Sequence, residues 1–261
     1  MGIVNVTPDS FSDGGAFLDP HRAVEHAVQL VAEGADWLDI GGESTRPGAT
    51  PVPLDEELRR VIPVIQGLMS KTDTPISIDT YKPEIARAAI KAGAQIINDV
   101  TGFRDPAMVD LAAQTDAGCV VMHMRGTPAD MMERTNYENV VAELIDYFGE
   151  RIDRLTRAGV ERERIILDPG IGFAKTRPDN LRLLHRLDEF ATLGRPILLG
   201  ASRKRIIGEI TQRGNEGRLF GTIATSLWGY LRGAHLLRVH DVGPTRDALV
   251  MIRAIEEEGS Q

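Results

Sequence analysis

The sequence has little cysteine and a shortage of positive charge. Its single cysteine among 261 residues, Cys119, excludes a framework of disulfide bonds and agrees with a cytoplasmic location. Cys119 lies in the apolar run GCVVMHM, which favours a place in the core over a role as a nucleophile. The 30 Lys and Arg residues face 38 Asp and Glu, and the formal net charge is −8. That balance disfavours a nucleic-acid partner, although it permits a local basic site.

Long hydrophobic runs are missing as well. No stretch approaches the ~18 consecutive apolar residues that span a membrane. No basic segment leads into an apolar one near the start, so a signal peptide is not indicated. Val6 stands where an N-myristoylation motif requires Ser or Thr. We therefore expect a cytoplasmic protein with no membrane partner and no nucleic-acid partner.

The chain does contain a repeated pattern of short apolar, β-branched runs. Each run is continuous rather than alternating, as expected for strands buried on both faces of a parallel sheet. Segments with apolar residues at helical spacing separate the runs, and several of these segments end at a glycine. The eight runs occupy residues 2–6, 37–42, 75–80, 95–100, 119–124, 164–170, 196–201 and 236–241.

Eight strands and eight helical segments in strict alternation, without a linker or a change of composition, predict an α/β fold. In a chain of this length the pattern is typical of a (β/α)8 TIM barrel, formed here as a single domain over residues 1–261. The main alternative is a doubly wound open sheet, which is weakened because no GxGxxG motif follows the first run.

Polar residues gather where the expected strands end, which in a barrel is the face that carries the active site. Some of them, such as Thr80, Asp99 and Asp241, are equally well explained as caps of loops or helices. A purely structural role for all eight strand ends is disfavoured, since burying such groups without partners is costly. The set comprises Asn5, Glu43, Ser44, Thr45, Arg46, Asp79, Thr80, Asn98, Asp99, Met122, His123, Asp168, Ser202, Arg203, Lys204, Arg238, His240 and Asp241.

The cationic members of this set are suited to an anion. Arg46, Lys204, Arg238 and His240 could together hold a phosphate or a pyrophosphate on an otherwise acidic protein. The stretch GASRKRIIGEI adds a helix N-terminus after the seventh strand, whose backbone N–H groups also suit an anion. The alternative for this stretch is a capped helix that carries solvated Arg and Lys side chains.

The acidic and amide members indicate a different ligand. Three strands contribute Asp79, Asn98 and Asp168. As a group, these side chains need a partner, which could be a ligand with several N–H donors, a metal, or Lys204. A metal alone is the weaker answer, because no second histidine or tight pair of carboxylates follows at ligand spacing. A flat heterocycle with an amino group and a ring N–H would satisfy both acids.

Motifs for nucleophilic catalysis are missing. The sequence has no GxSxG, no Cys–His pairing and no HExxH. Lys204 could form a Schiff base, as in an aldolase barrel. The multiply basic stretch SRKR favours a solvated lysine, which argues against that chemistry.

Eight segments of the chain resemble dihydropteroate synthase, in order and over essentially the whole length. Any one of them is modest evidence, but eight in register at the strand ends are highly specific. The segments are GIVNVTPDSFSDGG, DIGGESTRPGA, SIDTYKPEIA, IINDVTG, VVMHMRGTP, LDPGIGFAKT, GASRK and RVHDV.

The resemblance implies an enzyme of folate synthesis. That family joins 6-hydroxymethyl-7,8-dihydropterin pyrophosphate to p-aminobenzoate, giving 7,8-dihydropteroate and pyrophosphate with the help of Mg²⁺. It also implies a homodimer. Residues 219–231, LFGTIATSLWGYL, fit a dimer interface, and they fit a buried helix equally well.

The resemblance further implies the roles of individual residues. The pterin would be bound by Asp79, Asn98, Met122, Asp168, Lys204 and Arg238. The pyrophosphate would be bound by Asn5, Arg46, Arg238 and His240, with Asn5 also binding Mg²⁺. The p-aminobenzoate side would be formed by Phe11, Thr45, Pro47, Phe173, Ser202 and Lys204. The catalytic residues would be Asp13, Asp168, Lys204, Arg238 and His240, beneath two mobile loops at 6–18 and 43–53.

This reading predicts a largely dissociative substitution. The leaving group carries several negative charges, which Mg²⁺, two Arg and a His would stabilise. Asp79 and Asp168, at the far edge of the pterin, would favour positive charge on its exocyclic CH₂. An arylamine is already neutral and needs no strong base, and the two loops would exclude water.

Two departures from the family and two alternative functions remain at this stage. Family members usually carry residues before the first strand that cover the barrel floor, so here we expect either a truncated start or a floor closed in another way. An open floor would expose apolar side chains and so lower stability and solubility. Ala174 stands where many members have Gly.

The alternative functions are the methyltetrahydrofolate-binding barrel of a corrinoid methyltransferase and a non-catalytic pterin-binding paralogue. Neither needs the pyrophosphate residues Arg46, Arg238 and His240.

Overall fold

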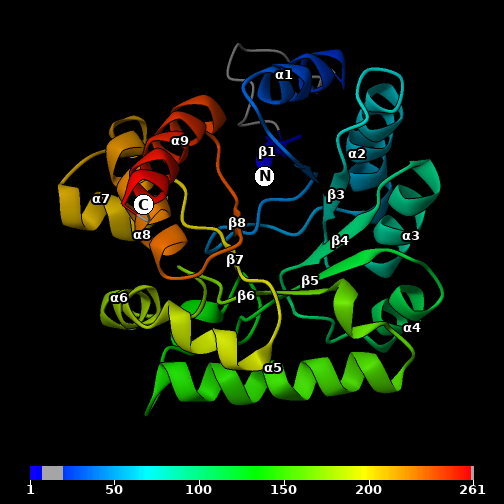
Figure 1. The fold of residues 1–261 in the computed structure, drawn as a ribbon. Helices are drawn as coiled ribbons and strands as arrows, with labels where there is room; N and C mark the ends of the chain where they lie inside the picture. Colours follow the sequence, from blue (N-terminus) through cyan, green and yellow to red (C-terminus); the bar gives the residue numbers. More distant parts are fainter. Residues whose placement is uncertain (8–19, 260–261) are drawn as a thin grey trace.

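The structure is a computed structural model that describes residues 1–7 and 20–259. A ring of parallel strands lies at the centre and helices surround it (Figure 1). The strands are β1 (Gly2–Asn5), β2 (Leu38–Gly41), β3 (Ile76–Asp79), β4 (Ile96–Asp99), β5 (Gly118–Met122), β6 (Ile165–Asp168), β7 (Leu198–Leu199) and β8 (Leu236–Leu237). The helices are α1 (Pro20–Ala32), α2 (Leu54–Leu68), α3 (Pro83–Ala92), α4 (Pro106–Ala113), α5 (Val140–Arg157), α6 (Arg177–His185), α7 (Arg205–Thr211), α8 (Leu219–Leu231) and α9 (Val242–Glu258).

The strands close into a barrel. Strands β1 to β6 pair in sequence order, and β7 pairs with β8. Two parallel bridges join the sheets, one between Leu167 and Ile197 and the other between Gly2 and Val239. Every one of the eight expected strands is present, each shorter than its apolar run, and the predicted (β/α)8 barrel is confirmed.

The two faces of each strand explain why the runs are apolar throughout. Outward side chains such as Ile40, Ile78 and Val121 pack against the helices in one large core. Inward side chains form a second cluster, from Ile96, Val120, Ile166 and Leu198 on four successive strands. Because side chains alternate along a strand, the next inward positions are Asn98 in β4, Met122 in β5 and Asp168 in β6, at or next to the strand ends.

The lone thiol belongs to the large outer core. Cys119 is completely buried in β5, and its Sγ lies 3.6 Å from the carbonyl oxygen of Ala117. Burial raises the pKa of this thiol to about 12. Its place in the core is as expected from the sequence.

The segment between β7 and β8 differs from the regular pattern. It holds two helices, α7 and α8, where the alternation predicts one. Gln212, in the left-handed conformation, ends α7, and a short 3₁₀ turn at Asn215–Arg218 leads into α8. Within residues 1–7 and 20–259, no helix is long and apolar enough to cross a membrane.

Candidate active site

The inward polar side chains converge at the carboxyl ends of the strands. Asp79 ends β3, Asn98 lies one residue before the end of β4 and Asp168 ends β6, and all three are buried. Lys204 and Arg238 follow β7 and β8 and are half-buried. The structure therefore brings together the acid, amide and basic residues that the sequence predicts as the site.

An arginine held between two acids forms the centre of this cluster. The Nε of Arg238 donates to Oδ2 of Asp39 at 2.6 Å, and an Nη donates to Oδ2 of Asp79 at 2.6 Å. The Nδ2 of Asn98 donates to the same Oδ2 of Asp39 at 3.1 Å. Since a guanidinium has five N–H donors, three remain on Arg238 for a ligand.

Asp39 is a site residue that the sequence analysis missed. It is completely buried, and it lies in the middle of an apolar run rather than at a strand end. The alternation of side chains along the strand could have identified it, because Asp39 is two positions before Gly41 and therefore faces inward with it. Oδ1 of Asp39 and Oδ1 of Asp79 accept no hydrogen bond from the described residues, and both are buried. Two orphaned acceptors beside an arginine are suited to a ligand with N–H donors.

Burial dominates the ionisation of this cluster. It raises the pKa of Asp79 to about 7, against the opposing field of Arg238. The pKa of Arg238 is raised, since the fields of Asp39 and Asp79 outweigh its own burial. Asp79 is therefore the member of the cluster whose charge changes near neutral pH.

Asp168 and Lys204 form the other side of the cavity mouth. Oδ1 of Asp168 accepts the backbone N–H of Gly170 at 2.7 Å, and burial raises the pKa of this carboxyl. Burial, followed by repulsion from Arg238, lowers the pKa of Lys204 to about 8. Lys204 is half-buried against Phe173, whereas the stretch SRKR favoured a solvated lysine. Gly200 adjoins Asp168 and Arg238, since a Cβ built there would lie in van der Waals contact with Oδ2 of Asp168 at 3.6 Å and with Cδ of Arg238 at 3.9 Å.

An apolar wall adjoins the lysine. The Nζ of Lys204 lies 4.0 Å from the centre of the Phe173 ring, a cation–π contact. Phe173 and Met122 are both buried, in one cluster with Val100, Met124 and Ala174. This wall offers a flat ring an apolar face beside a cation.

His240 and Ser202 lie together beyond β7 and β8. The Oγ of Ser202 is 2.9 Å from Nδ1 of His240, and it accepts the backbone N–H of His240 at 3.2 Å. Burial, followed by the field of Arg238, lowers the pKa of His240 to about 3. The imidazole is thus neutral at neutral pH and offers an anion a hydrogen bond rather than a charge.

The remaining predicted residues lie on loops or at the start of the barrel. Thr45 is half-buried, whereas Arg46 and Pro47 are exposed on the loop between β2 and α2. That loop touches a second one where the N–H of Gly48 donates to the carbonyl of Pro128 at 3.1 Å. Asn5 is half-buried at the end of β1. Phe11, Asp13 and most of the predicted first loop lie outside the described residues.

Lys175 is a second residue that the sequence analysis missed. It is fully buried, and burial lowers its pKa to about 7. Its Nζ lies 3.0 Å from Nδ1 of His123, and it donates to the carbonyls of Gly170 at 3.1 Å and Phe173 at 2.9 Å. Lys175 thereby ties the end of β5 to the loop that carries Phe173.

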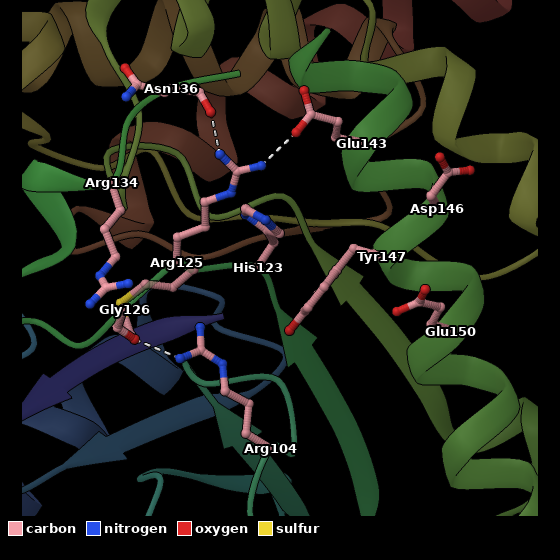
Figure 2. Close-up of a pocket in the computed structure, with 11 residues that line it drawn as sticks. Arg104, His123, Arg125, Gly126, Arg134, Asn136, Glu143, Asp146, Tyr147 and Glu150 are labelled. Carbon is pink, nitrogen blue, oxygen red and sulfur yellow. Dashed lines mark hydrogen bonds and ion pairs between the residues drawn. The ribbon is translucent and has the colours of Figure 1, made fainter. Parts of the chain in front are cut away.

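A separate cavity of about 610 Å³ lies on the far side of His123, between the loop after β5 and helix α5. Figure 2 shows Arg104, Arg125 and Arg134 on its loop side, facing the acidic side chains of α5. Arg125 is already engaged, because it donates to Oε2 of Glu143 at 2.5 Å. The charges of this cavity largely balance one another, and none of the predicted ligand-binding residues lines it.

Comparison with known proteins agrees with the geometry of the strand-end cluster. A family profile described as pterin binding enzyme matches residues 1–240. The chain is 45% identical over 254 residues to dihydropteroate synthase of Escherichia coli strain K12, covering 97% of this chain and 90% of that protein.

Solved structures are similar over nearly the whole chain. The dihydropteroate synthase of Xanthomonas albilineans with 4-aminobenzoic acid superposes with a TM-score of 0.93 at 51% identity, covering 98% of this chain and 92% of that one. The same enzyme in complex with 7,8-dihydropteroate gives a TM-score of 0.90 at 48% identity, with the same coverage.

Proposed function

This chain belongs to the dihydropteroate synthases of the pterin binding enzyme family, and from that membership we propose how its own residues carry out the reaction. The reaction joins 6-hydroxymethyl-7,8-dihydropterin pyrophosphate to p-aminobenzoate and releases pyrophosphate, so the enzyme is a transferase of a pterinylmethyl group. One observation carries the assignment of roles. Buried acids with free oxygens line the barrel mouth beside Lys204 and Arg238.

The inner cluster binds the pterin. Asp168, Asp79 and Asn98 accept from and donate to the amino and ring-nitrogen edge of the heterocycle, which thereby supplies a partner for the orphaned Oδ1 of Asp79. Lys204 faces the pterin carbonyl, while Met122 and Arg238 flank the ring. The two carboxylates also favour positive charge on the ring, which is the charge that develops as the leaving group departs.

The outer residues bind the pyrophosphate. The free N–H groups of Arg238, together with Arg46 and the neutral imidazole of His240, donate to its oxygens. The bond from the exocyclic CH₂ to the pyrophosphate oxygen breaks first, and its electron pair leaves with pyrophosphate. Arginine donors that strengthen their contact as this charge grows lower the barrier.

Mg²⁺ fits this site through the amide oxygen of Asn5 and the substrate itself. No cluster of three or more His, Cys, Asp or Glu suited to a metal exists among residues 1–7 and 20–259. Mg²⁺ usually keeps several waters and binds through one or two carboxylates plus substrate phosphates, so the amide of Asn5, at the end of β1, would supply one protein oxygen beside the pyrophosphate. When bound, the ion would neutralise charge on the leaving pyrophosphate.

The arylamine enters between the apolar wall and the loop after β2. Phe173 packs on its ring, and Thr45, Pro47, Ser202 and Lys204 surround the other sides. Its nitrogen lone pair forms the new C–N bond to the CH₂ carbon, and the nitrogen then releases a proton. A neutral amine needs no strong base before attack, in keeping with the absence of a nucleophile–base motif in the sequence.

The experiment that tests these roles is Asp168→Asn. The amide keeps the size of the side chain but removes the charge, and we expect kcat/KM to fall by about a hundredfold or more. Pyrophosphate release with p-aminobenzoate as cosubstrate measures the rate, and circular dichroism checks the fold. A variant with unchanged kcat/KM would show that Asp168 does not hold the pterin. A parent protein that releases no pyrophosphate would instead favour a methyltetrahydrofolate-binding barrel or a silent paralogue.

The outer surface of α8 and α9 supports a homodimer. The buried side of α8 carries the small residues Thr222, Ser226 and Gly229, so this helix is not the buried apolar helix that its sequence also allowed. Its apolar side chains point outward, beside those of the neighbouring α9. The exposed set comprises Phe220, Leu231, Val250, Met251 and Ile255, each more than half exposed. We assign this face to a second copy of the chain.

A further inference from the structure

Behind the loop after β2 lies a buried ionic cluster that the reaction does not use. The Nζ of Lys82 donates to Oε2 of Glu43 and to Oε2 of Glu57, each at 2.6 Å. The three side chains are 17%, 6% and 1% exposed, so the cluster is shielded from water. The hydroxyl of Tyr81 adds a hydrogen bond to Oε1 of Glu43 at 2.6 Å.

This cluster joins the two ends of the loop to each other. Oε2 of Glu43 accepts the backbone N–H of Val52 at 2.9 Å. Lys82 donates to the backbone carbonyl of Val52 at 2.6 Å. Both backbone polar groups of Val52 are therefore held by the Glu43–Lys82 pair, and residues 44–51 form a closed segment above it.

The cluster is rooted in the barrel by its third member. Glu57 lies in the first turn of α2, and its Oε1 accepts the hydroxyl of Thr80 at 2.9 Å. Thr80 directly follows Asp79, which binds Arg238. A continuous chain of polar contacts thus connects the ends of the loop to the strand end that carries a pterin-binding acid.

The closed segment carries a residue of the proposed site. Arg46 lies within residues 44–51, on the loop that leaves the carboxyl end of β2 and leads to α2. In addition to the contacts at its two ends, the segment is held in its middle at Gly48, whose N–H donates to the carbonyl of Pro128. The side chain of Arg46 is exposed, and it makes no ion pair with any of the described residues. Its position therefore depends on the backbone of the loop.

We propose that Glu43 and Lys82 are positioning residues, which hold residues 44–51 over the barrel mouth and thereby place Arg46 against the pyrophosphate of the substrate. This inference rests on the role proposed for Arg46 in the reaction. Glu43 removes the conformational freedom of the loop at its stem, so that Arg46 is ordered before the substrate binds. A displacement of about 1 Å in such a group can cost a hundredfold in rate.

The first test compares Glu43→Ala with Glu57→Gln. Both variants remove one carboxylate from Lys82, but of the two side chains only that of Glu43 contacts the loop, at Val52, so Glu57→Gln is the control for loss of charge and stability. We expect hydrogen exchange in a peptide covering residues 44–53 to speed up at least tenfold in Glu43→Ala and to stay within threefold in Glu57→Gln. Unchanged exchange in Glu43→Ala, or an equal increase in both variants, would overturn the positioning role.

The second test asks whether Glu43 acts through Arg46. We expect Glu43→Ala to raise the KM for the pterin pyrophosphate about tenfold, with a smaller change in kcat. The double variant Glu43→Ala/Arg46→Ala should then be no worse than Arg46→Ala, because the group that Glu43 places is already gone. Losses that multiply would show that Glu43 acts independently and would overturn the proposal. Full activity in Arg46→Ala would contradict the role of Arg46 itself, which the exchange experiment does not depend on.

Discussion

At the scale of single residues, the site is organised around one half-buried arginine that two buried acids share. Arg238 is 199 residues from Asp39 and 159 from Asp79 in the sequence, yet it donates to both at 2.6 Å. The strand-end pattern predicts Asp79 and Arg238 as site residues, but it cannot predict that they bind each other. Asp39 escapes prediction because it interrupts an apolar run, where the expected residue is a core aliphatic.

The ionisation of Asp79 and Lys204 predicts a narrow pH optimum. Asp79 must be charged to hold Arg238, and its pKa is raised to about 7, so kcat/KM should fall as the pH drops below that value. Lys204 must be protonated to face the pterin carbonyl, and its pKa is lowered to about 8, so kcat/KM should fall as the pH rises above that value. The full pH profile of kcat/KM measures both limbs.

Lys204→Arg is the control for the alkaline limb. A guanidinium stays protonated throughout the accessible range, so the fall above pH 8 should disappear even if the maximal rate is lower. An alkaline limb that stays in place in this variant would assign it to another group.

At the scale of elements, the connections after the strands set the shape of the site. Ala174 adopts a φ of 49°, a left-handed conformation that favours glycine, which gives a physical reason for the Gly that many family members have there. The methyl group of Ala174 is fully buried in the apolar wall with Phe173 and Met122, so its packing offsets part of the backbone cost. Gln212, in the left-handed conformation, ends α7 and so separates it from α8 in the connection between β7 and β8.

Gly170 provides a test of the turn after β6. Its φ is 65°, and a Cβ built there lies 2.2 Å from the carbonyl oxygen of His123. Gly170→Ala should therefore lower the free energy of unfolding by about 3 kcal/mol, from backbone strain plus a clash with main chain. Denaturation in urea measures the change.

Gly159→Ala is the matched control for that variant. Gly159 has a φ of 103°, but a Cβ built there meets nothing within 4 Å, so the substitution adds backbone strain without a clash. We expect the smaller loss from Gly159→Ala. Equal losses of unfolding free energy in the two variants would mean that the backbone at residue 170 can move away from His123 without cost.

At the scale of the whole molecule, the barrel follows from the repeat of eight continuous apolar runs, and this much could be read from sequence. The runs predict strands buried on both faces, and their number with the chain length predicts closure. Which face of α8 lies outward could not be read, because its sequence is apolar nearly all round. Only packing shows that Thr222, Ser226 and Gly229 fit the tight side against the barrel. At Gly229 a Cβ would lie 2.2 Å from Cδ2 of Leu199, so any larger residue there would force the Leu199 side chain to shift.

The outward apolar face predicts how the assembly state responds to charge. Leu231→Glu with Ile255→Glu places two carboxylates on exposed positions of α8 and α9, so the fold of a single chain should be preserved. We expect the parent to sediment as a dimer and the double variant as a monomer, in analytical ultracentrifugation at micromolar concentration.

Glu209→Gln, on the neighbouring α7, serves as the control and should leave the sedimentation coefficient unchanged. A parent that sediments as a monomer would remove the homodimer, and a double variant that remains dimeric would place the interface on another face.

The buried thiol of Cys119 makes the chain a convenient background for site-specific labelling. Only a thiolate reacts readily with maleimides, and this one is both enclosed in β5 and held protonated by a pKa of about 12. A cysteine introduced at Ala49, at the half-buried tip of the loop after β2, would thus be the single reactive position without removal of the natural one. A fluorophore there would report the position of that loop in real time as each substrate binds.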